Sequence, residues 1–187
     1  MTDRKRLVIG ISGASGVIYG IRLLQALKEF PVETHLVMTR TAEVTLAHET
    51  TMKVSDVQAL ADRTHRADDL AAAISSGSFR TIGMIVAPCS MRSLGEIASG
   101  ISSNLLTRAA DVVLKERRRL VLMVRETPLH AIHLRNMTVL AEMGAIIAPP
   151  VPAFYNRPQT LDDVIDHTIG RVLDLFDLDT GKVKRWS

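Results

Sequence analysis

One stretch of sequence decides the fold of this chain, Arg6-Leu-Val-Ile-Gly-Ile-Ser-Gly-Ala-Ser-Gly-Val-Ile-Tyr-Gly20. The apolar run 7–11 predicts a buried parallel strand, and the pattern over 17–30 predicts a helix. The loop between them consists of Ser12, Gly13, Ala14, Ser15 and Gly16. A helix N-terminus presents unpaired N–H groups and the positive end of its dipole, so this loop predicts a site for a phosphorylated ligand.

The spacing of the glycines narrows the identity of that ligand. Ser12 stands where the dinucleotide fingerprint G-x-G-x-x-G needs its second glycine. The second expected strand ends at Met38-Thr39-Arg40, without the acidic residue that would take a ribose hydroxyl. Arg40 could meet a 2′-phosphate, so an NADP site is disfavoured but stays open. The P-loop and esterase-elbow patterns are absent, and a tight turn without a ligand is the structural alternative.

Length and composition favour one α/β domain over residues 1–187. Hydrophobic residues make up 47% of the chain, and the net charge of +3 is scattered apart from a cluster at 115–119. Nucleic acid is therefore not an expected partner, and no apolar run approaches the length needed to span a membrane. The single cysteine, Cys89, excludes an internal disulfide and fits a cytoplasmic protein.

Apolar runs alternate with helical patterns along the whole chain. Strands are expected at 7–11, 34–38, 82–87, 120–124 and 145–148, and helices at 17–30, 40–48, 105–118, 129–142 and 161–176. The segment 53–78 is ambiguous, with an edge strand within 57–65 and a helical turn within 68–74 as options. Gly144 is expected to end the fourth helix. This alternation predicts a doubly wound parallel sheet, whose ligands bind at the carboxyl ends of the strands.

Three residues invite a reading as nucleophile or metal ligand. Cys89 lies at the end of an expected strand, and the sequence pairs no histidine with it that could activate its thiol. Cys89 is therefore expected to be a small residue packed in the core rather than a nucleophile. His130 and His133 have the spacing of two ligands on one helix, but no third ligand is apparent. The sequence therefore predicts no metal site.

Three charged residues near the expected ligand edge have two readings each. Glu49 is expected in the last turn of a helix, where a carboxylate meets the negative end of the dipole. It is either a proton-transfer group or a solvated surface residue, and removing its charge should leave stability unchanged or slightly improved. Arg125 and Glu126 follow a buried strand, as an ordinary ion pair or as functional groups; their place at the ligand edge favours function.

Taken in order, these residues resemble the UbiX-like flavin prenyltransferases, a family long labelled phenylacrylic acid or 3-octaprenyl-4-hydroxybenzoate decarboxylases. The resemblance runs nearly end to end, and two departures are mild: Thr39 replaces a common serine, and Arg119 replaces a common proline. The motifs that carry it are Gly10-Ile-Ser-Gly-Ala-Ser-Gly16, Glu49-Thr50, Pro88-Cys-Ser90, Asn104-Leu-Leu-Thr-Arg108 with its continuation to Arg118, Leu122-Met-Val-Arg-Glu-Thr-Pro128, Pro149-Pro-Val-Pro-Ala-Phe-Tyr155, Arg171 and Arg185-Trp186.

The resemblance implies a Rossmann-like three-layer α/β/α fold with strand order 3-2-1-4-5-6. It implies transfer of a dimethylallyl group from dimethylallyl monophosphate to reduced FMN, without a metal. The prenylated FMN would pass to a separate UbiD-like decarboxylase, and the enzyme would be a dodecamer with active sites shared between subunits. The implied FMN contacts are Ser12, Gly13, Ala14, Ser15, Thr39, Ser90, Met91, Arg92, Ser93 and Arg125.

The implied chemistry also gives tasks to charged residues. A departing phosphate needs fixed positive charge and hydrogen bonds. Lys115, Arg125, Arg171 and Tyr155 would supply these, assisted by Arg108 and with Trp186 at the substrate. Tyr155 and Arg171 are expected to act across a subunit boundary. Ser15, Glu49 and Glu126 are candidates for a proton relay, and Ser15, Glu49, Glu126 and Lys115 are the expected catalytic set.

Two other functions remain open from the sequence. The chain could be an FMN-dependent decarboxylase that acts directly, although a carboxylate substrate needs less positive charge than the set that includes Lys115, Arg125 and Arg171. It could also be an accessory subunit that carries FMN without changing it.

Overall fold

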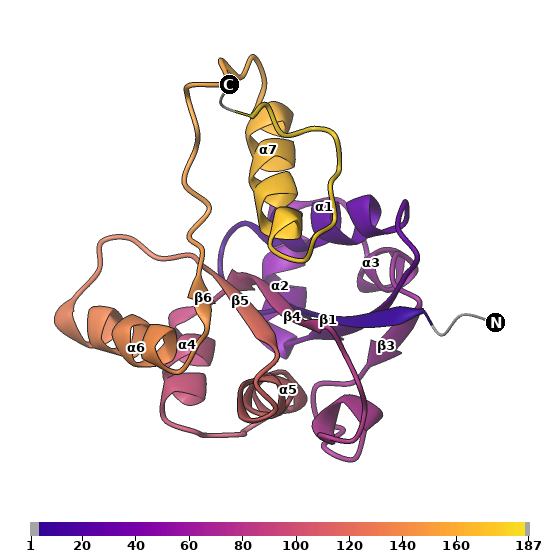
Figure 1. The fold of residues 1–187 in the computed structure, drawn as a ribbon, viewed down its shortest axis with the longest axis vertical. Helices are drawn as coiled ribbons and strands as arrows, with labels where there is room; N and C mark the ends of the chain where they lie inside the picture. Colours follow the sequence, from indigo (N-terminus) through magenta and orange to yellow (C-terminus); the bar gives the residue numbers. More distant parts are fainter. Residues whose placement is uncertain (1–3, 186–187) are drawn as a thin grey trace.

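The computed structural model describes residues 4–185. These residues form a six-stranded parallel sheet with the order β3-β2-β1-β4-β5-β6, which confirms the doubly wound fold and the strand order (Figure 1). The strands are β1 (Lys5–Ile11), β2 (Val32–Met38), β3 (Arg63–His65), β4 (Gly83–Cys89), β5 (Arg119–Val124) and β6 (Ile146–Ile147).

Helices cover both faces of the sheet and complete three layers (Figure 1). One face packs against α1 (Val17–Leu27), α2 (Arg40–Glu49), α3 (Val54–Gln58) and α7 (Leu161–Asp174). The other face packs against α4 (Met91–Ala98), α5 (Leu105–Lys115), α6 (Ala131–Glu142) and the 3-10 turn η1 (Ala73–Ser75). Strands β1 and β4 at the centre are almost entirely buried, because both of their faces are covered.

The elements differ from the sequence-based expectation in a few places. Helix α4 was not expected; the Ser90 hydroxyl caps it by accepting the N–H of Ser93, and its apolar face buries Leu94 and Ile97. Residues 54–58 are helical rather than strand, so only β3 remains of the optional edge strand. Gly144 has a φ of +99° just after α6, which confirms its role in ending that helix.

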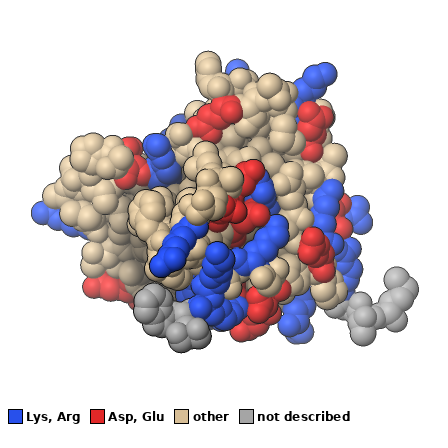
Figure 2. Space-filling view, turned by 90° about the horizontal axis from the view of Figure 1, so that it is seen from above, with Lys and Arg blue, Asp and Glu red and all other residues tan. Residues whose placement is uncertain are grey.

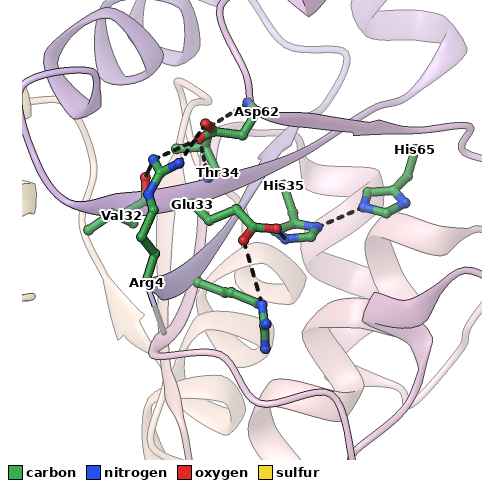
Figure 3. Close-up of polar contacts among 8 residues, drawn as sticks. Arg4, Val32, Glu33, Thr34, His35, Asp62 and His65 are labelled. Atoms are coloured by element: carbon green, nitrogen blue, oxygen red, sulfur yellow. Dashed lines mark hydrogen bonds and ion pairs between the residues drawn. The ribbon is translucent and has the colours of Figure 1, made fainter. Parts of the chain in front are cut away.

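The short edge strand β3 is anchored to β2 by side chains as well as by the sheet (Figure 3). His35 Nδ1 and His65 Nε2 lie 3.0 Å apart, and the two rings stack with centroids 5.3 Å apart. His35 Nε2 lies 3.0 Å from a carboxylate oxygen of Glu33. Asp62, just before β3, accepts hydrogen bonds from the N–H and hydroxyl of Thr34. These contacts hold β3 and the residue just before it against β2.

The surface mixes charges of both signs. Figure 2 shows acidic and basic side chains lying beside one another over much of the face it presents, with wide areas of neither. This matches the scattered charge of the sequence. Among residues 4–185, no helix combines the length and the apolar character that crossing a membrane requires.

Candidate functional site

The carboxyl edge of the sheet carries a cavity of about 840 Å³. Such a volume is typical of a small-molecule or cofactor site. Its walls come from the segments that follow β1, β2, β3, β4 and β5 and from the start of α5. The lining residues are Gly13, Ala14, Ser15, Thr39, Arg40, Thr41, Val44, Ala67, Asp68, Ser90, Met91, Arg92, Ser93, Glu96, Ser103, Asn104, Arg125 and Glu126. The structure therefore brings together every expected FMN contact except Ser12.

Ser12 lies beneath the cavity and holds two strand ends together. Its side chain is buried, and its hydroxyl donates to the carbonyl of Pro88 (2.9 Å) and accepts the N–H of Ser90 (2.7 Å). The hydroxyl has one proton to donate, and that proton is already used. Ser12 does not line the cavity, and its hydroxyl sets the position of the turn at Ser90; a contact between Ser12 and FMN stays a prediction.

Gly13 allows the first loop to approach the second. A Cβ atom at this position would lie 2.4 Å from the Cβ of Thr41 at the start of α2. No side chain fits there without moving one of the two loops. The glycine therefore keeps the backbone of the β1–α1 loop close to α2 and beside the cavity.

Glu49 has a structural role that its own helix does not reveal. Its carboxylate accepts hydrogen bonds from the N–H groups of Gly16 (3.1 and 2.9 Å) and Val17 (3.0 Å) at the start of α1. Burial alone would raise the pKa of Glu49. Hydrogen bonds from Ser15, Gly16 and Val17 and the nearby guanidinium of Arg125 outweigh that effect and hold the pKa below its ordinary value.

The expectation that removing the charge of Glu49 leaves stability unchanged or slightly improved considered only α2, but the carboxylate also contacts α1. At the negative end of α2 the charge is unfavourable, but the same carboxylate lies at the positive end of α1. The Glu49 side chain therefore caps α1, whose own N-cap residue, Gly16, has no side chain that could do so. Glu49 does not line the cavity, although Ser15, which donates to it, does.

Three other helix N-termini open toward the cavity. Each has a side-chain cap: Thr39 accepts the N–H of Ala42, Ser90 that of Ser93, and Asn104 those of Leu106 and Thr107. The capping residues Thr39, Ser90 and Asn104 all line the cavity. Their helices are α2, α4 and α5, whose dipoles together favour an anionic ligand.

The arginines that line the cavity differ in whether they form an ion pair. Arg92 is paired with Glu96 at 2.8 Å, and Glu96 also accepts the hydroxyl of Ser103. Arg40 and Arg125 form no ion pair with another described residue. The carboxylate of Glu126 accepts a hydrogen bond from the N–H of Thr127. Arg40 and Arg125 are therefore the available positive charges in this cavity.

The remaining residues of the expected phosphate clamp lie outside the cavity of their own chain. Lys115 ends α5, about 16 Å along the helix from its cavity-facing start, and pairs with Glu116. Arg108 pairs with Asp111, Arg171 pairs with Asp174, and the Tyr155 hydroxyl lies 3.1 Å from His167 Nε2. Tyr155 and Arg171 were expected to act across a subunit boundary, and their place outside the cavity of their own chain is compatible with that prediction. Trp186 lies outside the described residues.

Sequence reasoning missed several residues of the cavity wall. Thr41, Val44, Ala67, Asp68, Glu96 and Ser103 were not singled out, and Asn104 appeared only within a motif. Ala67 and Asp68 follow β3, so recognising that strand would have found them. Glu96 and Ser103 belong to α4 and to the segment after it.

The contacts of Cys89, His130 and His133 are those of structural residues. Cys89 is fully buried, and burial raises the pKa of its thiol to about 12, so little thiolate forms at neutral pH. His130 caps α6 through Nδ1, which accepts the N–H of Ile132, and its ring stacks on His133. Among residues 4–185, no group of three or more His, Cys, Asp or Glu side chains could hold a metal ion.

The fold and the cavity define a Rossmann-like protein with a site for an anionic nucleotide or flavin. The model of the flavoprotein family matches residues 1–173. Flavin prenyltransferase UbiX of Escherichia coli strain K12 is 64% identical over 173 residues, which cover 92% of each chain. Flavin prenyltransferase UbiX of Thauera aromatica is 56% identical over 182 residues, which cover 97% of this chain and 94% of that one.

Solved structures of UbiX-like proteins also match this chain in fold and in sequence. AnUbiX (PadA1), in complex with FMN and dimethylallyl pyrophosphate, matches with a TM-score of 0.97 and 55% identity, over 99% of this chain and 98% of that one. A dodecameric FMN-dependent UbiX-like decarboxylase from Escherichia coli O157:H7 matches with a TM-score of 0.95 and 54% identity, over 97% and 99%. This chain belongs to the UbiX flavin prenyltransferases, within the flavoprotein family.

Proposed function

We propose that this chain transfers a dimethylallyl group from dimethylallyl monophosphate to reduced FMN and so makes prenylated FMN. The observation that carries the proposal is the cavity at the carboxyl edge, which combines hydroxyls, three helix N-termini and unpaired arginines. The solved relative AnUbiX, which holds FMN and dimethylallyl pyrophosphate, supports it.

The residues present fit FMN. The close approach of Gly13 to Thr41 leaves a narrow cradle of backbone and hydroxyl groups, from Ser15 and Thr39, for a terminal phosphate. Ser90, Met91 and Ser93 lie across the cavity, where they would flank the ring system. Reduced FMN, when bound, supplies the nucleophilic ring atoms that accept the allyl group.

In this scheme the protein's own groups bind, orient and move protons. Arg125 is placed to neutralise charge on flavin and substrate, because no described carboxylate pairs with it. Glu126 adjoins Arg125 on the cavity wall. Ser15 donates to Glu49, so a proton leaving the reacting centre has a path through the Ser15 hydroxyl to a carboxylate held ionised.

We propose that Arg108, Lys115, Tyr155 and Arg171 complete the phosphate clamp of a neighbouring chain, with Trp186 beside the allyl group. Lys115, Tyr155 and Arg171 are about half exposed. Asp174 also pairs with Arg185, so Arg171 can exchange Asp174 for a phosphate without leaving that carboxylate unpaired. Val151, Phe154 and Leu161, in the segment 151–161 that contains Tyr155, expose 72–76% of their surface, as subunit contacts would require.

A dodecamer would form such shared sites, and a related structure is dodecameric. We further propose that the prenylated FMN passes to a UbiD-like decarboxylase. The single cysteine fits a reducing compartment, and we place the protein in the cytoplasm.

Mass spectrometry of the flavin tests the proposal. The protein is incubated without oxygen with reduced FMN and dimethylallyl monophosphate, and the extracted flavin should gain the mass of one isoprene unit. Arg125→Ala should abolish the product, whereas Arg80→Ala, which removes an exposed arginine outside the cavity, should not. Unmodified FMN from the wild-type protein would contradict prenyl transfer.

A further inference from the structure

His167 is a buried histidine next to two residues of the proposed phosphate clamp. It lies in the middle of α7 and is only 5% exposed. Its Nε2 atom lies 3.1 Å from the hydroxyl of Tyr155, and the two rings meet edge to face with centroids 5.6 Å apart. Arg171 follows one helical turn later, so His167 and Arg171 lie on the same side of α7. The proposed function uses Tyr155 and Arg171 but gives no task to His167.

The ring of His167 is neutral at pH 7. Burial is the main cause that lowers its pKa, and the nearby guanidinium of Arg171 lowers it further. The carboxylate of Asp174 acts in the opposite direction but does not offset them. A neutral imidazole carries one proton on its two nitrogens, so one nitrogen donates and the other accepts. The nitrogen that carries the proton determines the direction of the hydrogen bond with Tyr155.

The surroundings of Nδ1 decide which nitrogen of His167 carries that proton. Nδ1 is buried and has no hydrogen-bond partner among residues 4–185. A proton on Nδ1 would therefore leave a buried N–H group unpaired. A proton on Nε2 leaves only a lone pair unpaired at Nδ1. In protein interiors, unpaired N–H groups are rarer than acceptors that lack a partner, so the tautomer with the proton on Nε2 is favoured.

This tautomer makes Tyr155 the acceptor in its hydrogen bond with His167. The Nε2–H group donates, and the phenol oxygen accepts. A phenol has a single proton, and in this arrangement the imidazole does not take it, so Tyr155 keeps its capacity to donate. The oxygens of a phosphate dianion only accept hydrogen bonds. With the opposite tautomer, Tyr155 would spend its proton on His167 and present an acceptor to another acceptor.

We propose that His167 is a positioning residue for the allyl phosphate: its Nε2–H group holds the oxygen of Tyr155 so that the hydroxyl proton is directed to a phosphate oxygen, beside the guanidinium of Arg171. This inference rests on the proposed function, which brings the phosphate to Tyr155. His167 acts through Tyr155 and does not itself touch the substrate. The alternative is a purely structural contact that holds the segment before α7 against the helix.

Two variants with the same amide group separate these roles. In His167→Gln the amide nitrogen reaches the place of Nε2 and can donate to Tyr155. In His167→Asn the shorter side chain reaches only the place of Nδ1. Calorimetric titration with dimethylallyl monophosphate, on protein saturated with oxidised FMN, measures binding of the donor without turnover. FMN affinity and Tm report on folding, because residue 167 does not line the cavity.

We expect His167→Gln to bind the allyl phosphate within about twofold of wild type, and His167→Asn to bind it about three- to tenfold more weakly, because the Tyr155 hydroxyl is no longer held in place. In the Tyr155→Phe background the two variants should bind it equally, since no hydroxyl is left to position. Nitrogen NMR of isotope-labelled wild type, with His167 assigned from the signals that His167→Gln loses, should show a proton on Nε2 and none on Nδ1.

A proton on Nδ1 would overturn the proposal, and that measurement on wild type does not depend on whether a variant folds. Equal affinities of His167→Gln and His167→Asn for the allyl phosphate would overturn it as well. So would a difference between them that persists in Tyr155→Phe, because the contact would then be structural. Failure of the proposed function is a separate result, in which the wild-type protein leaves FMN unmodified in the mass assay.

Discussion

Replacing Glu49 with glutamine should destabilise the protein, although the position of Glu49 at the end of α2 suggests the opposite. The carboxylate accepts the N–H groups of Gly16 and Val17 at the start of α1, where no other side chain caps the helix. Glutamine keeps one acceptor oxygen but loses the second oxygen and the charge. We expect the α1 cap to weaken and the midpoint of thermal unfolding to fall.

The magnitude follows from the two interactions that change. A side chain that caps a helix N-terminus contributes about 0.5–2 kcal/mol, and a charge near that terminus about 0.3–1 kcal/mol. Because the amide retains part of the cap and residue 49 is exposed, we expect a loss of about 0.5–1 kcal/mol. For a chain of this length that corresponds to a decrease of about 1–4 °C in Tm.

The effect should depend on pH in one direction. The pKa of Glu49 is lower in the folded chain than in the unfolded one, so its contribution is present above the unfolded pKa of about 4.3. It is lost as the pH falls through the folded pKa, where wild type and variant should converge. Glu142→Gln is the matched control, because Glu142 also ends a helix, α6, and makes no hydrogen bond with a described side chain or backbone group.

Scanning calorimetry at pH 7 and at pH 3, at one protein concentration, makes the comparison. Glu142→Gln should leave Tm unchanged or slightly higher at pH 7. Equal Tm values at pH 7 for the wild type and Glu49→Gln would refute the capping argument, since the carboxylate would then contribute nothing to α1.

Three further predictions follow from other residues. Burial holds the pKa values of His35 and His65 below the ordinary value, so the unfolded chain takes up protons at a higher pH than the folded chain does. The free energy of unfolding, measured in urea, should therefore decrease as the pH falls below about 6.5. The substitution His35→Leu should make this pH dependence weaker. Ser12→Ala leaves the Ser90 N–H unpaired and should cost about 1–3 kcal/mol in the free energy of unfolding while weakening FMN binding in a fluorescence titration. Lys115→Ala should lower kcat in the mass assay with FMN affinity unchanged, and a parallel loss of FMN affinity would place Lys115 in the cavity instead.

Much of the fold could be predicted because its signals are local. The apolar runs of β1, β4 and β5 are short and flanked by small residues, and parallel strands buried on both faces show such runs. Most of the cavity could be predicted for a topological reason. The carboxyl ends of parallel strands meet at one edge, so residues as distant in sequence as Ser15 and Arg125 had to lie near each other.

The misses come from interactions that sequence spacing does not encode. Helix α4 has eight residues, including Gly95, and is shorter than the stretch of 11–18 residues over which helical periodicity is usually recognised. The task of Glu49 depends on a partner 33 residues earlier in the chain, so its own helix gives the wrong expectation. Ser12 has the residue type of a ligand contact, but it does not line the cavity, and its hydroxyl is bonded to Pro88 and Ser90.

The proposed phosphate clamp would make activity depend on assembly. Within one chain the cavity offers Arg40 and Arg125 as unpaired charges, and a phosphate leaving without a metal needs more than two fixed partners. Lys115 and Arg171 do not line the cavity of their own chain, and under the proposed function they supply the further charge to the site of a neighbouring chain. A dissociated chain should therefore keep its hydroxyl cradle and bind FMN, yet fail to release phosphate from the allyl donor. Dilution or an interface substitution such as Phe154→Glu should consequently abolish turnover before it abolishes flavin binding, and the two losses would coincide only if one chain carried the whole site.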